Sequence, residues 1–407
     1  MTRATRAQTE QTEQTTATSR GPIRRAMTAT ALSLLLAATV PAAPTSAAEP
    51  TASPYIVVFQ DSVERPQALA REHARTHRAE VAFTYSSALK GYAARLDRRA
   101  YADIVSDPRV AYVEPDGVVH TTDTQPNATW GLDRIDQANL PLNGNYSYMS
   151  TGAGVTAYII DTGIDAGHVE FGDRAKPGFD AITSNGTADD CNGHGTHVAG
   201  TMGGTTYGVA KQVSLVAVRV LGCSGSGTTS QVIAGVDWVT GNHQPGAPAV
   251  ANMSLSSSGS RAMDNAVRSS IADGVTYAIA AGNGNVFGIA QDACKYSPSR
   301  VTEALTISAT TASDGKASFA NYGNCVDWFA PGMNITSAAN GPSNNETAVK
   351  SGTSMAAPHT AGVAALYLQG QAAASPATVR AALFALTTKD VVTGSSTAND
   401  HLLFTSY

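Results

Sequence analysis

Charged and aromatic side chains are both scarce in this sequence. Asp, Glu, Lys and Arg make up 14% of the 407 residues, and Phe, Trp and Tyr make up 6%. Coiled coils and disordered chains are usually rich in charge, so this composition argues against both classes. The chain instead contains 37 glycines, which is typical of a compact protein with many turns. Its length is sufficient for two or more domains.

Basic residues are especially few in the later part of the chain. From Asp123 onward, 13 Lys and Arg stand against 20 Asp and Glu, which gives a net charge of −7. This balance argues against binding to nucleic acid or to an anionic membrane surface. The spare carboxylates favour cations, and calcium is the hard cation expected in a secreted protein.

Long apolar runs are also rare, and the one candidate lies near the N-terminus. Arg24 and Arg25 precede the apolar stretch MTATALSLLLAATV, and the small residues PTSAA follow it. This order predicts a secretory signal over residues 1–48, cleaved after Ala47 or Ala48, and hence an extracellular protein. The stretch is too short to span a bilayer comfortably, so no membrane association is expected. A start at Met27 would remove both arginines and weaken the signal.

Cysteine is infrequent, and its positions limit its chemistry. The four cysteines are Cys191, Cys223, Cys294 and Cys325. None of them belongs to a CxxC pair, which argues against a cysteine metal site. In an exported protein, two disulfides are the expected state. The residues alone leave three pairings open.

Residues 49–122 have a pattern of their own. Apolar runs predict strands there, and charged amphipathic stretches predict helices. The predicted order is strand 55–60, helix 66–81, strands 81–86 and 92–96, helix 98–108 and strand 110–116. This β-α-β-β-α-β order predicts a small α+β domain, which an exposed linker at residues 117–130 would follow.

Residues 123–407 alternate short apolar runs with helical stretches. The runs include GVTAYIIDTG, VSLVAVRVL, VTYAIAAGN and ALTISAT. Fully apolar strands that alternate with helices require a parallel sheet covered on both faces. These residues are therefore predicted to form one α/β domain.

Two polar residues follow predicted strands of this sheet. Asp161 ends one strand and precedes the turn glycine Gly163, and Asn283 follows another. Parallel strands present active residues at their carboxyl ends, so both are candidates for one site. Each also has an ordinary interpretation, Asp161 as a turn cap and Asn283 as a left-handed turn residue. Alternatively, the Asn283 side chain can donate an N–H to a developing oxyanion.

Two histidines open a predicted helix in the stretch NGHGTHVAGT. His194 and His197 lie three residues apart, and histidine pairs on a helix can bind zinc. No glutamate completes an HExxH pattern, however, and the flanking Gly193 and Gly195 indicate a close backbone approach instead. Zinc is therefore disfavoured at this pair.

The stretch SGTSMAAPH at residues 351–359 opens an Ala-rich helix. A serine there is ordinarily a cap. At a helix N-terminus, however, Ser354 would lie beside the positive end of the dipole and free N–H groups, which suits a nucleophile and half of an oxyanion hole. His359 would be rotated away from Ser354 on the helix, so a general base must come from another loop.

The motifs DTG, NGHGTHVAG, AAGN and GTSMAAPH together resemble the subtilisin-like serine proteases, and within them the proteinase K and aqualysin branch. The order Asp, His, Ser is the one known from subtilisin itself. This resemblance extends from WGLDRIDQ nearly to the C-terminus. It implies a monomeric serine endopeptidase of broad specificity. Ser354 would be the nucleophile, His194 the general base, Asp161 its orienting carboxylate and Asn283 the oxyanion donor, with His197 a structural neighbour.

The resemblance also implies how a protein substrate binds. In this family the substrate lies extended between two backbone edges. The implied substrate-binding residues are Gly225, Ser226, Gly227, Ser254, Leu255, Ser256, Ala280 and Gly282. Ser256, Ser257 and Ser258 occupy positions where the family usually has glycine, which predicts a narrower S1 pocket and smaller P1 residues.

Residues 49–122 resemble the inhibitor-type propeptide of this family, which templates folding and then occupies the cleft. Autocleavage is accordingly expected between His120 and Asp123. The family pattern also implies that the disulfides join Cys191 to Cys223 and Cys294 to Cys325.

Structural calcium is a further implication of the resemblance. One implied site is Asp327 with the carbonyl oxygens of Thr302 and Ala304. A second is suggested by the oxygen-rich cluster of Asp133, Asp136, Gln137, Asn143 and Asn145. Without the resemblance, this cluster would be interpreted as a solvated loop.

A competing interpretation is an esterase of the α/β-hydrolase type. GTSMA is close to GxSxG, and Asp390 and His401 follow Ser354 in the order that those enzymes use. Against it, Ala356 replaces the final glycine, the preceding ETAVK is a weak strand, and DTG and NGHGTHVAG are left without a role. An inactive binding protein on the same fold is disfavoured because all four chemical groups are present.

Overall fold

A computed structural model describes residues 52–117 and 122–407 of the chain. The predicted signal segment at residues 1–48 lies outside these ranges, as do the first two residues of the predicted autocleavage stretch, His120 and Thr121. Near residue 118 the chain divides into two compact units. Within the described ranges, no helix combines the length and the apolar character needed to cross a bilayer.

The first unit has the predicted β-α-β-β-α-β order. Its elements are β1 (Ser53–Phe59), α1 (Pro66–His77), β2 (Glu80–Tyr85), β3 (Gly91–Leu96), α2 (Arg98–Val105) and β4 (Val110–Pro115). The strands form an antiparallel sheet in the order β2-β3-β1-β4. Both helices contribute to a core with β1 and β3, through side chains such as Leu69 and Ile104.

Helix α1 ends earlier than the pattern predicts. Arg78 adopts a left-handed conformation with φ of 53° and closes the helix. Glu80 then begins β2, which pairs with β3. The predicted end at Val81 was therefore wrong, because the pairing of these strands overrides the helical pattern of the sequence.

The second unit is built on a seven-stranded parallel sheet with the order β15-β14-β12-β10-β7-β9-β8. Its strands are β7 (Thr156–Asp161), β8 (Ala175–Asp180), β9 (Ser214–Arg219), β10 (Ala249–Met253), β12 (Thr276–Ala280), β14 (Leu305–Thr310) and β15 (Trp328–Pro331). Its helices are α3 (Trp130–Ile135), α4 (His194–Gly203), α5 (Thr229–Asn242), α6 (Arg261–Asp273), α7 (Thr353–Gly370) and α8 (Pro376–Leu386), with the 3-10 turn η1 (Ala293–Lys295). The predicted α/β class, a parallel sheet flanked by helices, is confirmed.

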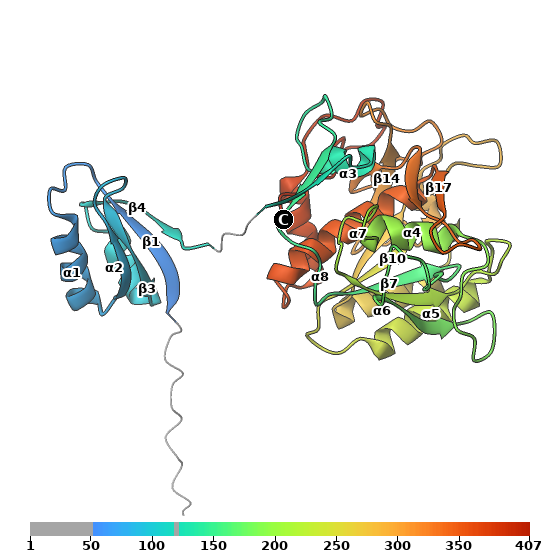
Figure 1. The fold of residues 1–407 in the computed structure, drawn as a ribbon, viewed down its shortest axis with the longest axis horizontal. Coiled ribbons are helices and arrows are strands. Elements are labelled where there is room, and N and C mark those ends of the chain that lie inside the picture. The colour runs from blue at the N-terminus through green and yellow to red at the C-terminus, as the bar shows by residue number, and fades with distance from the viewer. Residues whose placement is uncertain (1–51, 118–121) are drawn as a thin grey trace, which may run out of the picture. The chain divides into compact units, whose positions relative to one another are not determined.

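Helices cover both faces of this sheet. Ala157 and Ile159 of β7 belong to one core with α4, α7 and α8, whereas Tyr158 and Ile160 belong to another with α5 and α6. Figure 1 shows α4 and α7 on one side of β7 and β10, and α5 and α6 on the other. Alternate residues of one strand therefore enter two different cores, which explains why its sequence is apolar almost throughout.

Three small antiparallel pairs complete the second unit. They are β5 (Asp123–Pro126) with β6 (Asn145–Tyr148), β11 (Ser257–Ser258) with β13 (Tyr296–Ser297), and β16 (Ile335–Ala338) with β17 (Thr347–Lys350). Strand β17 leads directly into the segment that opens α7, so it positions the start of that helix.

Candidate active site

The carboxyl ends of the central strands carry the predicted reactive residues. Asp161 is the last residue of β7, and Asn283 follows β12 by three residues. His194 is the first residue of α4, and Ser354 is the second of α7. Both helices pack on the same face of the sheet, which brings their N-termini to the edge where β7 and β12 end.

Asp161 and His194 form a hydrogen-bonded pair. His194 Nδ1 lies 2.7 Å from Asp161 Oδ1, and the same oxygen accepts the Thr162 N–H at 2.8 Å. The Asp161 side chain is fully buried. Burial lowers the pKa of His194, but the charge and the hydrogen bond of Asp161 raise it by more, so the pKa lies above its usual value. The bond also fixes the imidazole with Nε2 free to face a second group.

Asp190 organises the loop that carries His194, although no motif in the sequence indicates this role. Its Oδ1 accepts from Thr162 Oγ1 and from the Gly193 N–H, both at 2.9 Å. Its Oδ2 accepts from Thr196 Oγ1 at 2.6 Å. A single carboxylate thus ties the end of β7 to the start of α4, and this fixes the distance between Asp161 and His194.

Lys350 is a second residue that the sequence did not reveal. Its Nζ donates to the carbonyl oxygen of Gly193 at 3.1 Å, so the ammonium group lies next to the residue before His194. This positive charge lowers the pKa of His194, against the raising effect of Asp161 and Asp190. The contact joins β17 to the start of α4.

Replacing Lys350 by methionine is expected to raise the pKa of His194. The substitution removes the positive charge that lowers this pKa and leaves the two carboxylates that raise it, Asp161 and Asp190, in place. An NMR titration of the His194 imidazole measures the change, and Lys350→Arg, which keeps the charge, serves as the matched control. Equal pKa values in the methionine variant and the unaltered protein would contradict this account.

Ser354 lies at the N-terminus of α7 and is only 9% exposed. Within the described residues, its Oγ donates to the carbonyl oxygen of Ser254 at 3.2 Å, and Ser254 Oγ donates to the Ser354 carbonyl at 2.8 Å. Ser254 and His194 line the same cavity. Catalytic hydrogen bonds often form only when substrate is bound, so the Ser254 contact describes a resting orientation of this hydroxyl.

Asn283 is held in one orientation beside Ser354. Its Oδ1 accepts from the Thr353 N–H at 2.8 Å and from Thr353 Oγ1 at 2.9 Å. Because these donors fix the oxygen, the Nδ2 group must point the other way, where it can donate to a ligand. Gly352 lies against this amide, since an added Cβ there would be 3.2 Å from Asn283 Nδ2.

A cavity of about 330 Å³ lies beside these residues. Its walls include His194 and six of the predicted substrate-binding residues, namely Gly225, Ser226, Gly227, Ser254, Leu255 and Ser256. Ser257 also lines it, whereas Ser258 pairs with Tyr296 between β11 and β13. The other two predicted positions, Ala280 and Gly282, do not line this cavity, although an added Cβ at Gly282 would lie 3.6 Å from Ser256 Oγ.

The two other histidines near these motifs are bound to the backbone. His197 Nε2 lies 3.0 Å from the Ile335 carbonyl oxygen, and His359 Nδ1 lies 2.8 Å from that of Met355. Burial lowers the pKa of each to about 4, so both stay neutral. Their contacts are those of scaffold residues, as the sequence analysis expects.

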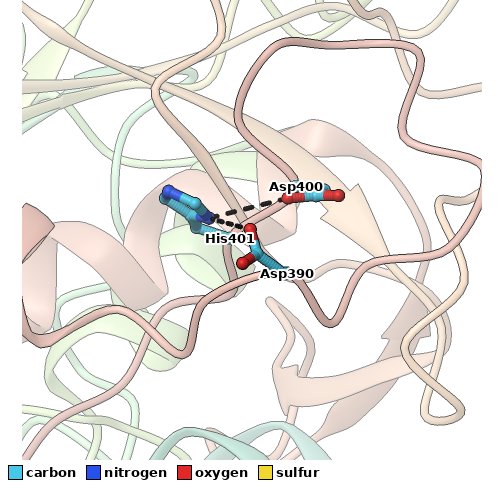
Figure 2. Close-up of side chains that lie close together, drawn as sticks. All are labelled: Asp390, Asp400 and His401. Carbon is cyan, nitrogen blue, oxygen red and sulfur yellow. Dashed lines mark ion pairs between the residues drawn. The ribbon is translucent and has the colours of Figure 1, made fainter.

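Asp390 and His401, the partners in the competing interpretation, lie in a different group. His401 Nδ1 is 3.7 Å from Asp390 Oδ1 and 3.7 Å from Asp400 Oδ1 (Figure 2). These three residues form a cluster, and the Ser354 hydroxyl is bonded instead to the Ser254 carbonyl oxygen. The Ser354, Asp390, His401 arrangement is therefore not favoured.

The disulfides have the pairing that the family pattern implies. Cys191 is bonded to Cys223 and Cys294 to Cys325, with Cα separations of 4.9 and 5.3 Å. Next to the first bridge, Asn192 Nδ2 donates to the Cys223 carbonyl at 2.9 Å. The bridge thus links the loop before His194 to the backbone edge at Gly225.

The Asp327 carboxylate, expected to be a calcium ligand, already has other partners in this structure. Asp327 Oδ1 accepts from Nη2 of Arg380, and from its Nε at 3.1 Å, while Oδ2 accepts the Thr306 N–H at 2.8 Å. The guanidinium already supplies the positive charge that this buried carboxylate needs. The structure therefore does not support a calcium site formed by Asp327, Thr302 and Ala304.

The second cluster fits a hard cation better. Asp136 Oδ1 and Gln137 Oε1 are both buried and have no hydrogen-bond donor among the described residues. Burial raises the pKa of Asp136 to about 6. Asp133 accepts the N–H groups of Asn143 at 3.1 Å and of Gly144 at 2.7 Å, which shapes the loop around these oxygens.

Comparison with known proteins places this geometry in a family. The subtilase family matches residues 152–401, and the peptidase inhibitor I9 family matches residues 54–122. An extracellular serine proteinase of Thermus sp. (strain Rt41A) is 50% identical over 369 residues, which cover 86% of this chain and 88% of that protein. The alkaline serine exoprotease A of Vibrio alginolyticus is 48% identical over 351 residues, which cover 85% of this chain and 62% of that protein.

A solved structure gives the same result. A cold-adapted subtilisin-like serine proteinase matches with a TM-score of 0.65 and 51% sequence identity, over 68% of this chain and 98% of that one. The resemblance seen in the four motifs is thereby confirmed over most of the chain's length. The chain belongs to the subtilase family of serine endopeptidases.

Proposed function

We propose that Ser354, His194 and Asp161 hydrolyse peptide bonds through an acyl-enzyme. The observation that carries this assignment is the 2.7 Å bond from His194 to a fully buried Asp161. His194 and Ser254 line the same cavity, and Ser354 is hydrogen-bonded to Ser254. His194 Nε2 takes the proton of Ser354 Oγ as the hydroxyl attacks the carbonyl carbon, and then gives it to the leaving amine. This division of roles is the one described for subtilisin itself. The test is to measure hydrolysis of a peptide amide with and without a serine-directed inhibitor, which should stop the reaction.

Asn283 supplies the oxyanion donor in this proposal. Negative charge develops on the carbonyl oxygen as the tetrahedral intermediate forms, and prealigned donors stabilise it. Thr353 holds Asn283 Oδ1, which leaves Nδ2 free for this purpose. The N–H of Ser354, at the N-terminus of α7, is the second donor.

Protein substrates of broad sequence are expected to bind in the cavity, extended between residues 225–227 and 254–256. Backbone edges read main-chain groups, so the side chains of the substrate matter mainly in pockets. Ser256 and Ser257 both contribute to the cavity wall. Their side chains take up volume that glycine would leave free.

We therefore expect a preference for small P1 residues. In a series of peptide p-nitroanilides with Ala, Leu or Phe at P1, kcat/KM should be highest for Ala or Leu and about tenfold lower for Phe, the scale of a modest steric penalty. Ser256→Gly should restore activity toward Phe, whereas Ser258→Gly, outside the cavity wall, should not. A higher kcat/KM for Phe than for Ala or Leu at P1 in the unaltered enzyme would contradict this expectation.

The first unit acts as an intramolecular inhibitor and folding template in this proposal. Support comes from the match of residues 54–122 to the peptidase inhibitor I9 family. We place the segment boundaries at residues 48 and 122, with autocleavage between His120 and Asp123. We also propose that the enzyme is monomeric and that it is secreted, the second of which the name of the extracellular Thermus relative supports.

Structural calcium is proposed at Asp136 and Gln137, with Asp133, Asn143 and Asn145 completing the loop. Calcium prefers carboxylate and amide oxygens, and two such oxygens are buried there without a donor among the described residues. A bound ion would compensate the buried charge of Asp136 and so stabilise the folded loop.

Removal of calcium is expected to lower the Tm. At a calcium concentration a hundredfold above Kd, binding contributes about 2.7 kcal/mol, which corresponds to roughly 4 to 5 °C for a domain as large as the second unit. Thermal unfolding with calcium or EDTA measures the difference. Asp136→Asn should abolish it and Asp327→Asn should retain it, while the reverse result would place the ion at Asp327.

The calcium-free protein should also respond to pH. The Asp136 carboxyl holds its proton up to about pH 6 when folded but only to about pH 3.8 when unfolded. Folding therefore favours the protonated form, and stability should fall as the pH rises from 3.8 to about 6. Added calcium should remove this loss, because it binds the ionised carboxylate.

A further inference from the structure

The loop that follows Asn283 exposes three large apolar side chains close together. Val286 is 94% exposed, Phe287 82% and Ile289 60%. Removal of such side chains from water is favourable. Val169, by contrast, has no other large exposed apolar residue within ten positions of it in the sequence. Single exposed apolar residues are normal, whereas a contiguous apolar set indicates a contact surface. Residues 286–289 are called the apolar tip below.

The apolar tip has a defined shape. Asn285 Oδ1 accepts the N–H groups of Phe287 at 3.0 Å and Ile289 at 3.2 Å. The Asn285 N–H in turn donates to the Ile289 carbonyl at 2.9 Å. These bonds close a tight turn around the Asn285 side chain, and the apolar side chains of the turn are exposed to solvent.

The base of this loop is fixed to the catalytic strand end. Asn321 Oδ1 accepts the N–H groups of Gly284 at 2.9 Å and Gln291 at 2.8 Å, while its Nδ2 donates to the Ala281 carbonyl at 2.9 Å. Both ends of the loop are thus held next to Asn283. Val286 is the third residue after Asn283, so their Cα atoms are at most about 11 Å apart.

We propose that the apolar tip is a contact surface for an apolar segment of an extended polypeptide substrate, outside the residues next to the scissile bond. The proposal rests on the assignment of Asn283 and Ser354 given above. Two observations favour this occupant: the tip adjoins the proposed oxyanion donor, and residues 284–291 contain no charged side chain. Extended chains expose the apolar side chains that folded proteins bury, so the tip favours unfolded substrates.

A triple variant, Val286→Ser with Phe287→Ser and Ile289→Ser, tests the proposal. The measured quantity is kcat/KM on denatured casein and on a short tetrapeptide p-nitroanilide. We expect a loss of about tenfold on casein and no change on the tetrapeptide, which consists only of residues next to the scissile bond and has no further apolar segment. Val169→Ser, a 63% exposed apolar residue elsewhere, should leave both values unchanged.

Three outcomes would overturn the proposal. Equal values for variant and parent on both substrates would show that the tip does not contact substrate. A similar loss on both would show that the loop only positions Asn283. Loss of self-association by sedimentation, with casein cleavage unchanged, would assign the tip to a second copy of the chain. Failure of the unaltered enzyme to cleave the tetrapeptide would instead refute the proposed function itself.

Discussion

Replacement of Ser354 by alanine is expected to lower kcat for peptide hydrolysis by about 10⁶-fold, the loss known for the nucleophile of subtilisin itself. Without Oγ no acyl-enzyme can form, although the cavity and Asn283 remain. Ser351→Ala is the matched control, since among the described residues Ser351 Oγ bonds only to Asn334, accepting its N–H at 2.8 Å and donating to its Oδ1 at 3.3 Å. Its kcat should stay within a few-fold of the parent. Equal losses in both variants would contradict the assignment of Ser354.

The same variant tests how the first unit is removed. Purified Ser354→Ala should remain uncleaved between His120 and Asp123, because the enzyme can no longer process itself. N-terminal sequencing after incubation without other proteases measures this. A processed N-terminus under these conditions would exclude self-cleavage.

His194→Ala is expected to lower kcat by roughly 10⁶-fold as well, while His401→Ala should leave it nearly unchanged. In subtilisin, loss of the histidine alone costs about as much as loss of the serine, because the two act as a unit. Here the 2.7 Å bond to Asp161 supports our proposal that His194 is the oriented base. His401 lies instead with Asp390 and Asp400.

The comparison of these two variants separates the competing mechanisms. kcat on one peptide p-nitroanilide measures both, and circular dichroism confirms that each variant is folded. Loss of activity only in His401→Ala would revive the esterase-like arrangement. Loss in neither would mean that another group accepts the Ser354 proton.

Much of the fold could be predicted from local patterns. Strand β7 is buried on both faces, so its sequence is apolar almost without interruption and indicates a parallel sheet. The end of α1 could not be predicted, because Glu80 pairs with Arg95 across the sheet, and nothing within the helix records that contact.

The reactive residues could also be found from sequence, since each follows a strand or opens a helix within a recognisable motif. The residues that hold them in place could not be found in this way. Lys350 contacts Gly193 across 157 residues, and Arg380 reaches Asp327 across 53. Isolated basic residues carry no local signal of such contacts. For that reason calcium at Asp327 was expected from the family resemblance, where the structure places a guanidinium.

Labelling with a fluorophosphonate, followed by mapping of the modified residue, tests the central claim most directly. The reagent reacts with a serine only where a base activates it and an oxyanion hole stabilises the adduct. The account predicts one label per chain, on Ser354, lost in His194→Ala and kept in His401→Ala. A label on any other serine, or an active enzyme that remains unlabelled at Ser354, would contradict it.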